Sequence, residues 1–318
     1  MTVRVLCVGE CMVELTHLDP GTLRLGFAGD TYNTAVYVAR VARELALDAD
    51  VGYLTGVGTD DFSAAMRAAW LADGVLDRSL IVPDHIPGLY AVRTAPDGER
   101  SFTYWRRESA ARALFADDAW CADLDADLVH LSGITMQLVS PTAREALVGR
   151  LAELRRAGAR VSFDTNYRPS GWASAHEAGA AMAQICAVAD IVLASREDEE
   201  QLHGRTPVEA SIARLEALGA REVVLRDGPD GAYVSAGGGV RHVPARRVDR
   251  VLDTTAAGDA FAGGYLAARL ANEPAESAAA LGNAVAAAVI QQPGAITPPE
   301  IRLVEPEQVR REIDVTTP

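Results

Sequence analysis

The most constraining feature of this chain is the alternation between short, almost continuous apolar segments and longer segments in which apolar residues follow helical spacing. The apolar segments are Val3–Val8, Leu128–Ser132, Val161–Asp164, Ile191–Ala194 and Val223–Arg226. The helical patterns occupy Pro141–Ala157, Trp172–Val188, Pro207–Leu218, Gly258–Leu270 and Ala275–Gln291. Strands that are apolar throughout need cover on both faces, as parallel strands have in α/β proteins. The sequence therefore predicts a three-layer α/β/α sandwich with a mainly parallel central sheet.

Two segments depart from this alternation and predict a lid. Residues 12–27 and 89–106 alternate apolar with polar side chains, and the second segment contains the turn sequence APDG at 95–98. This alternation and this kind of turn are typical of antiparallel hairpins. We therefore expect a small antiparallel sheet that covers a cleft beside the main sheet. The chain contains no low-complexity linker and no internal repeat, so we expect residues 1–318 to form a single domain.

The composition excludes several classes of function. The formal net charge is −14, from 44 acidic and 30 basic residues, and such a surface repels nucleic-acid phosphates. The chain contains no lysine, which excludes a Walker-A loop, the phosphate-binding lysine of protein kinases and Schiff-base catalysis. The six histidines are scattered and follow no metal-ligand spacing.

The cysteines and the apolar segments predict a location. The four cysteines form no CxxC pair, so we expect buried free thiols in a reducing compartment. The chain opens directly on a strand pattern, without the pattern of a signal peptide. The longest uncharged stretch, Ser277–Pro299, is interrupted by glycine, asparagine, glutamine and proline, which predicts a packed helix and a loop rather than a membrane span. We expect a cytoplasmic protein with no nucleic-acid or membrane partner.

The strongest chemical signal is the segment 253–265, DTTAAGDAFAGGY. Ligands of open α/β sheets bind beyond the carboxyl ends of the strands, and here small residues lead into a helix at such a place. The first turn of a helix attracts anions, and alanine and glycine let a phosphate approach the backbone closely. Asp259 in this turn can accept the proton of a hydroxyl that attacks the phosphate. Plain helix capping by Thr255 or Asp259 explains the same residues equally well.

Several blocks, in order along the whole chain, resemble the ribokinase-like (PfkB) carbohydrate kinases. The segment 253–259 is similar to the family signature DTxGAGD, with Ala256 in place of the first glycine. The variant DTTAAGD is associated with one branch of the family, the 2-keto-3-deoxygluconate kinases. The other matching blocks are GECMVEL (9–15), GDTYNTA (29–35), PGLY (87–90), GERSFTYWR (98–106), FDTNYRP (163–169) and VIQQPGA (289–295). The resemblance implies the ribokinase-like form of the sandwich and of its β lid.

The resemblance also implies roles, residue by residue. Asp259 would be the general base, and the backbone of Ala256, Ala257 and Gly258 the anion hole for the transferred phosphoryl group. The sugar-binding residues it implies are Gly29, Asp30, Asn33, Tyr90, Tyr104, Arg106 and Arg168, together with Asp259. The nucleotide-side residues it implies are Asn166, Ser195, Arg226, Gly228, Gly231, Ala257, Gly258 and Asn283. Residues 195–198, SRED, stand where the family carries its magnesium-linked NxxE, which implies Asp198 or Glu199 as an indirect support of the metal.

Ordinary structural explanations stay open for part of this set. Local capping at the start of a helix accounts for Asp30 and Asn33. A cross-strand aromatic pair in a lid hairpin accounts for Tyr90 and Tyr104. A plain turn accounts for the segment 227–231.

The implied activity is ATP-dependent phosphorylation of 2-keto-3-deoxygluconate to its 6-phosphate, with Mg²⁺. Arginine forks bind both oxygens of a carboxylate, so Arg106 and Arg168 favour a sugar acid over a neutral sugar. Arg106 stands beside Arg107, and such a pair is also typical of a solvated rim. Because Arg106 belongs to the lid, we expect it to be more exposed than Arg168. We expect a sugar acid and ATP as partners, and a homo-oligomer.

Three alternatives remain at this point. Within the class, the alternative is a kinase of another sugar, such as fructose or 2-keto-3-deoxygalactonate. An NAD-dependent oxidoreductase would carry GxGxxG after the first strand, whereas residues 8–12 read VGECM. A catalytically inactive sugar sensor would lack the base, whereas Asp259 is present.

Overall fold

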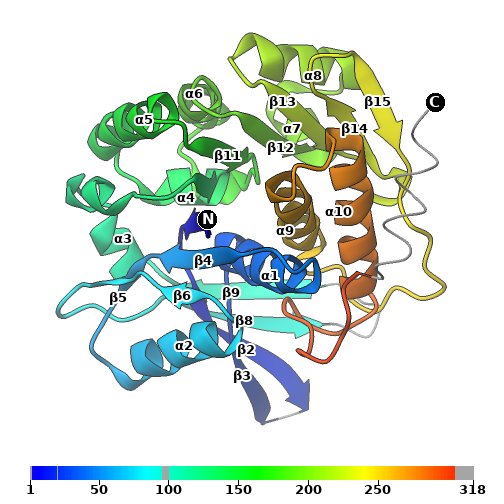
Figure 1. The fold of residues 1–318 in the computed structure, drawn as a ribbon. Helices are drawn as coiled ribbons and strands as arrows, with labels where there is room; N and C mark the ends of the chain where they lie inside the picture. The colour runs from blue at the N-terminus through cyan, green and yellow to red at the C-terminus, as the bar shows by residue number, and fades with distance from the viewer. Residues whose placement is uncertain (1, 20, 95–99, 305–318) are drawn as a thin grey trace.

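The computed structural model describes residues 2–19, 21–94 and 100–304 of the chain. A nine-stranded sheet lies at its centre, in the order β15-β14-β13-β12-β11-β10-β1-β4-β6 (Figure 1). The strands are β1 (Val3–Val8), β4 (Ala49–Leu54), β6 (Leu76–Asp77), β10 (Leu128–Ser132), β11 (Arg160–Asp164), β12 (Ile191–Ser195), β13 (Glu222–Arg226), β14 (Ala232–Ser235) and β15 (Val240–Val243). The strands from β13 to β6 run parallel, and β14 and β15 extend the β13 edge in antiparallel fashion. The mainly parallel sheet is confirmed.

Helices cover both faces of the sheet. One buried apolar cluster lies under α1 (Asp30–Glu44), α2 (Asp61–Ala72), α9 (Ala257–Leu270) and α10 (Ala275–Val289). A second lies under α3 (Ala110–Leu114), α4 (Gly133–Leu138), α5 (Pro141–Arg156), α6 (Ala175–Cys186), α7 (Arg196–His203) and α8 (Val208–Ala217). Val5 enters the first cluster and Leu6 the second, because successive side chains of a strand point to opposite faces. This is the predicted three-layer sandwich.

Serine caps set where several helices begin. The hydroxyl of Ser174 accepts a hydrogen bond from the backbone N–H of Glu177 (3.1 Å), so α6 begins at Ala175, three positions after the predicted Trp172. The residues Pro169–Gly171, just before the predicted start, form a short 3₁₀ turn. Side-chain oxygens at this position satisfy backbone N–H groups that have no partner within the helix.

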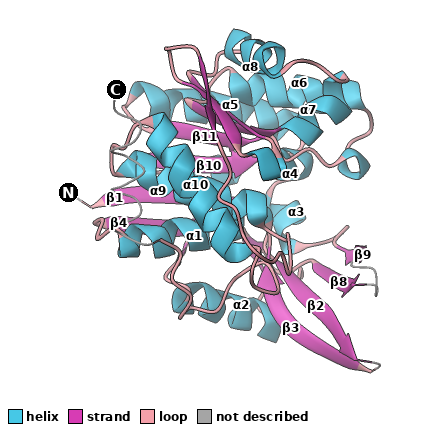
Figure 2. Ribbon diagram, turned by 90° about the vertical axis from the view of Figure 1, so that its right-hand side faces the viewer, coloured by secondary structure: helices cyan, strands magenta, loops and turns pink. Residues whose placement is uncertain are grey.

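A four-stranded sheet projects from the body of the molecule, as Figure 2 shows. It has the order β3-β2-β8-β9, from β2 (Met12–Asp19), β3 (Thr22–Ala28), β8 (Leu89–Thr94) and β9 (Arg100–Trp105). The two predicted hairpins, β2/β3 and β8/β9, are antiparallel, and they join through a parallel pairing of β2 with β8. The turn expected at 95–98 lies outside the described residues. The short strands β5 (Gly56–Val57) and β7 (Leu80–Ile81) form a separate pair.

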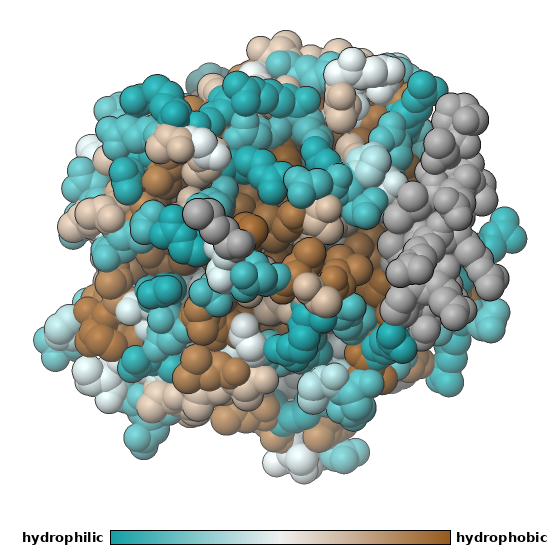
Figure 3. All heavy atoms as spheres, in the orientation of Figure 1, coloured by the Kyte–Doolittle hydropathy of each residue, from teal (hydrophilic) through white to brown (hydrophobic). Residues whose placement is uncertain are grey.

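The surface and the buried thiols agree with the composition. Hydrophilic side chains cover much of the face seen in Figure 3, with apolar atoms showing between them. All four cysteines are free and buried, as predicted. Within the described ranges, no helix has both the length and the apolar character needed to cross a membrane.

Candidate active site

The segment 253–259 forms a turn that leads into α9. Asp253 holds this turn from within, because its carboxylate accepts hydrogen bonds from the backbone N–H groups of Thr255 (2.7 Å) and Gly294 (2.8 Å). Ala256 adopts φ 59° and ψ 13°, a left-handed conformation that costs a residue with a Cβ about 1 kcal/mol. No side chain caps the start of α9 within the described chain. The amino end of α9, which is positive, therefore offers backbone N–H groups to an anion.

Asp259 lies in the first turn of α9, among other charged groups. The side-chain amide of Asn33 donates a hydrogen bond to its Oδ2 (2.8 Å). Burial, together with the nearby carboxylates of Asp30 and Asp164, raises the pKa of Asp259 to about 7, against the opposing charge of Arg226. A carboxylate whose pKa lies near neutral pH is well matched to take a proton from a hydroxyl.

The predicted sugar residues of α1 meet Asp259 at the carboxyl edge of the main sheet. Gly29 precedes the helix, and a Cβ built on it would lie 2.1 Å from the backbone oxygen of Glu10, so only glycine fits there. Burial also raises the pKa of Asp30. Asn166, predicted on the nucleotide side, donates its amide to Oδ2 of Asp30 (2.8 Å) instead. The structure thus places Asn166 beside the predicted sugar residue Asp30, and its role on the nucleotide side stays a prediction.

The lid contributes aromatic side chains. Tyr90 and Tyr104 are direct cross-strand partners of β8 and β9, with ring centroids 5.8 Å apart. The hydroxyl of Tyr90 donates to Glu14 of β2, whereas Tyr104 is half exposed. Burial raises the pKa of Tyr104 while the charges of Arg106 and Arg168 lower it, so both arginines act on the hydroxyl of Tyr104 through their charge. The cross-strand pair of Tyr90 and Tyr104 is therefore present, and sugar binding by the same two residues stays a prediction.

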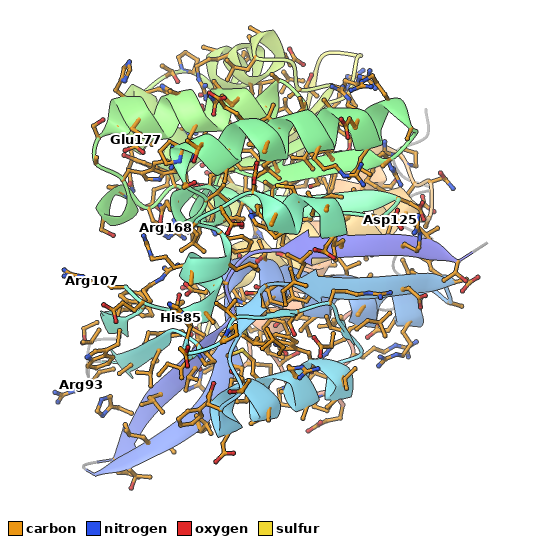
Figure 4. All side chains as sticks on the ribbon, turned by 90° about the vertical axis from the view of Figure 1, so that its left-hand side faces the viewer. His85, Arg93, Arg107, Asp125, Arg168 and Glu177 are labelled. Atoms are coloured by element: carbon orange, nitrogen blue, oxygen red, sulfur yellow. The ribbon has the colours of Figure 1, made fainter. Side chains whose placement is uncertain are left out.

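The two arginines differ from the prediction in their exposure. Arg106 is the more buried, with 21% of its side chain exposed, and it forms an ion pair with the buried carboxylate of Glu10. Ser109, the cap of α3, donates its hydroxyl to the other oxygen of Glu10. Arg168 is 56% exposed and its nearest carboxylate oxygen, on Asp198, lies 3.6 Å away. Figure 4 shows Arg168 on the side of the molecule that carries the lid, above Arg107. Arg168 therefore has the less neutralised charge.

On the nucleotide side, several predicted residues bond within the protein. The amide of Asn283 donates to the backbone oxygens of residues 243 and 244, and the hydroxyl of Ser195 caps α7. Gly231 has φ 102°, and a Cβ there would lie 2.2 Å from the backbone oxygen of Val243. Gly228, at φ 52°, has open space beside it. Of these four residues, Gly228 has open space beside it for a ligand, and the nucleotide-side roles of Asn283, Ser195 and Gly231 stay predictions.

The two carboxylates predicted to support a metal, Asp198 and Glu199, have different partners in the structure. Asp198 is buried, accepts a hydrogen bond from the hydroxyl of Thr165 (3.3 Å) and faces Arg168. Glu199 is buried against α8, where it forms an ion pair with Arg214, and its indirect support of a metal stays a prediction. The described residues contain no group of three or more His, Cys, Asp or Glu side chains that could hold a metal ion. A single carboxylate fits Mg²⁺, which proteins commonly hold through one or two carboxylates and the substrate's phosphates.

Arg226 does not reach out from the predicted phosphate loop. Its Nη2 donates to Asp164 (2.7 Å) and its Nη1 to the backbone oxygen of Gly258 (2.9 Å). The sequence placed Asp164 and Glu10 at strand ends and gave neither a role. Their signal was weak, because a carboxylate at the end of a strand has many uses, and their arginine partners are distant in the chain.

The comparisons with known proteins agree over most of the chain. Residues 3–302 match the pfkB family of carbohydrate kinases. The 2-dehydro-3-deoxygluconokinase of Escherichia coli K12 is 44% identical over 309 residues, which cover 94% of this chain and 99% of the relative. That of Dickeya dadantii is 40% identical, with 94% and 98% covered. A solved aminoimidazole riboside kinase of Salmonella enterica, complexed with aminoimidazole riboside and an ATP analogue, superposes with a TM-score of 0.79 at 26% identity, with 98% and 99% covered. With its mainly parallel sheet, its lid and its Asp259 at the start of α9, the chain belongs to the pfkB family of carbohydrate kinases.

Proposed function

We propose that this protein phosphorylates 2-keto-3-deoxygluconate with ATP, giving 2-keto-3-deoxy-6-phosphogluconate. The observation that carries the proposal is the position of Asp259, in the uncapped first turn of α9, bonded to Asn33 and beside Asp30. A base for the hydroxyl and N–H groups for the phosphoryl group lie in one turn of helix. The relatives named 2-dehydro-3-deoxygluconokinase support the choice of sugar.

In the proposed reaction, Asp259 takes the proton of the terminal hydroxyl. That oxygen forms a bond to the γ-phosphorus of ATP, the bond from phosphorus to the β–γ bridging oxygen breaks, and ADP leaves with the bond's electron pair. The backbone N–H group of Gly258 stabilises the charge on the phosphoryl oxygens, and that of Ala257 joins it on leaving its 3.2 Å bond to the backbone oxygen of Thr254. Asp198 is the carboxylate that would support a Mg²⁺ ion, which neutralises phosphate charge when bound. The lid excludes water, which competes as an acceptor.

The substrate's carboxylate is the feature that distinguishes a sugar acid from a neutral sugar. Arg168 is half exposed, and its contacts to the backbone oxygen of Tyr167 (2.9 Å) and to Asp198 (3.6 Å) both engage Nη1, so its remaining N–H groups can turn to a carboxylate. Arg106 also acts on the hydroxyl of Tyr104 through its charge, as Arg168 does. We place the carboxylate between these arginines, which favours the sugar acid.

A fructokinase-like activity is the alternative, because a fructokinase of E. coli is 32% identical over 84% of this chain. The discriminating experiment measures ADP release with 2-keto-3-deoxygluconate, 2-keto-3-deoxygalactonate, fructose and ribose. We expect the first acid to give the highest kcat/KM. Equal efficiency on fructose would overturn the assignment of a sugar acid.

We further propose that residues 1–318 act as one cytoplasmic kinase domain that assembles with copies of itself. The buried free thiols suit a reducing compartment. The lid carries exposed apolar side chains, namely Leu18, Leu23, Leu25, Phe102 and Trp105, and such patches favour association. Light scattering coupled to size exclusion tests the assembly, and replacing Leu23 and Leu25 with serine should give a monomer.

A further inference from the structure

Arg226, at the end of β13, ties three elements together beneath the site. Its Nη1 donates to the backbone oxygen of Gly258 in α9 (2.9 Å) and its Nη2 to Asp164 Oδ1 at the end of β11 (2.7 Å). Its Nε donates to the backbone oxygen of Ala194 in β12 (3.3 Å). Only 12% of the side chain is exposed, so the guanidinium is held by the protein rather than by solvent.

The place of this cation is unusual for a helix. The amino end of a helix carries partial positive charge, so a cation beside the first turn of α9 is unfavourable by itself. It is compensated by carboxylates that converge from separate elements: Asp164 bonds it directly, and Asp259 lies close enough for the two charges to interact. The position of the Arg226 guanidinium is therefore explained by the carboxylates around it, and not by a contribution to the stability of α9.

Gly258 shows that the backbone is shaped around the guanidinium. A Cβ built on Gly258 would lie 3.1 Å from Nη1 of Arg226, closer than ordinary packing. The missing side chain at this position makes room for Arg226, in addition to any phosphate that approaches the opposite side of the turn.

We propose that Arg226 is a positioning residue for phosphoryl transfer: through its bonds to Gly258 and Asp164 it holds the first turn of α9, and with it Asp259, against the end of β11. The proposal rests on the proposed function in so far as Asp259 is the base. The ionisable and hydrogen-bonding groups that face Asp259 are Asp30, Asn33 and Tyr37 of α1, Asp164 of β11 and Arg226.

Two substitutions should move the titration of Asp259 in opposite directions. Arg226→Met removes the cation, so the acid limb of the kcat–pH profile should move to higher pH by between about one and three units. Asp164→Asn removes an anion and releases Arg226 toward Asp259, so the limb should move to lower pH. General loosening of the fold would move both variants the same way, and that result would overturn the proposal.

Arg226→Lys separates charge from geometry. Lysine keeps the cation but cannot span Gly258 and Asp164 with a planar fork, so kcat should fall at least tenfold while the acid limb moves by less than one unit. Unchanged kcat in Arg226→Lys would refute the orienting role. If Arg226→Met does not fold, the Arg226→Lys variant alone tests that role.

A measurement without substrate keeps this test independent of the sugar. Carbon-13 NMR of labelled aspartate carboxyl groups, with Asp259→Asn used for assignment, reports the titration of Asp259 directly. An unmoved titration in Arg226→Met would overturn the proposal. If 2-keto-3-deoxygluconate is not phosphorylated, the proposed function fails while the NMR titrations still decide the role of Arg226.

Discussion

The side-chain amide of Asn33 donates a 2.8 Å hydrogen bond to Oδ2 of Asp259, a residue 226 positions away in the chain. The amide's own oxygen accepts the backbone N–H of Gly29 (3.4 Å), so its orientation is set by the start of α1. The bond engages one oxygen of Asp259, and we assign the other oxygen to the proton of the substrate. The base is thus oriented by the element that carries the predicted sugar residues.

Replacing Asp259 with asparagine should abolish most of the activity. Asparagine keeps the shape of the side chain but cannot take a proton, and general-base catalysis contributes roughly 10²–10⁴-fold. We expect kcat to fall by that factor, with KM for both substrates little changed, in a steady-state assay. Asp61→Asn is the matched control, because Asp61 is an exposed aspartate in the first turn of another helix, α2. Near-normal kcat in Asp259→Asn would remove Asp259 from the mechanism.

The same substitution should stabilise the protein above neutral pH. The pKa of Asp259 is about 7 in the folded chain against an ordinary 3.8, so between these values the folded state binds more protons than the unfolded state. Its free energy of unfolding therefore falls as the pH rises through this window, and the loss is complete above about pH 7. Asp259→Asn removes the loss, so the variant should exceed the wild type by about 2 kcal/mol at pH 8, after a discount for partial exposure.

Urea unfolding near pH 4, 6 and 8 measures this difference. The gap between variant and wild type should shrink toward pH 4, where the folded wild-type protein holds the proton and the unfolded state begins to bind one. A gap that is the same at all three pH values would show that Asp259 titrates normally in the folded chain.

Arg168→Ala should remove most of the preference for a sugar acid. A hydrogen bond to a charged group contributes about 1.5–3 kcal/mol, so kcat/KM for 2-keto-3-deoxygluconate should fall roughly ten- to a hundredfold, with little change for fructose. Arg106→Ala should weaken both substrates, because Arg106 also holds the lid to Glu10. Arg107→Ala is the control, since Arg107 is exposed. An unchanged ratio of acid to neutral sugar in both variants would exclude these arginines as its cause.

Glu10→Gln should destabilise the protein by about 3 kcal/mol, because it leaves the charge of Arg106 buried without its partner. The matched control is Asp125→Asn, which breaks the exposed pair with Arg4, whose side chains are 47% and 68% exposed for Arg4 and Asp125. Exposed pairs contribute up to about 1 kcal/mol. Thermal unfolding measures both, and equal losses would show that Glu10 does not pair with Arg106 in a buried site.

The local patterns determined the secondary structure and the position of Asp259, the proposed base. Continuous apolar segments, period-two alternation and helical spacing reflect which faces are buried, so they predicted the parallel strands, the lid hairpins and α9 respectively. The order of the short blocks, ending in DTTAAGD, identified the family.

Only the tertiary structure decided which side chains meet. Asn166 bonds Asp30 across 136 positions, Arg226 bonds Asp164 across 62, and Glu199 turns to Arg214 on the next helix. A motif states that an arginine or a carboxylate is present, but its partner depends on how separate elements pack, which no local spacing encodes. The same reason explains the exposure of the two arginines. The lid residue Arg106 is more buried than Arg168 because it pairs with Glu10, which follows β1 and is distant from Arg106 in the sequence.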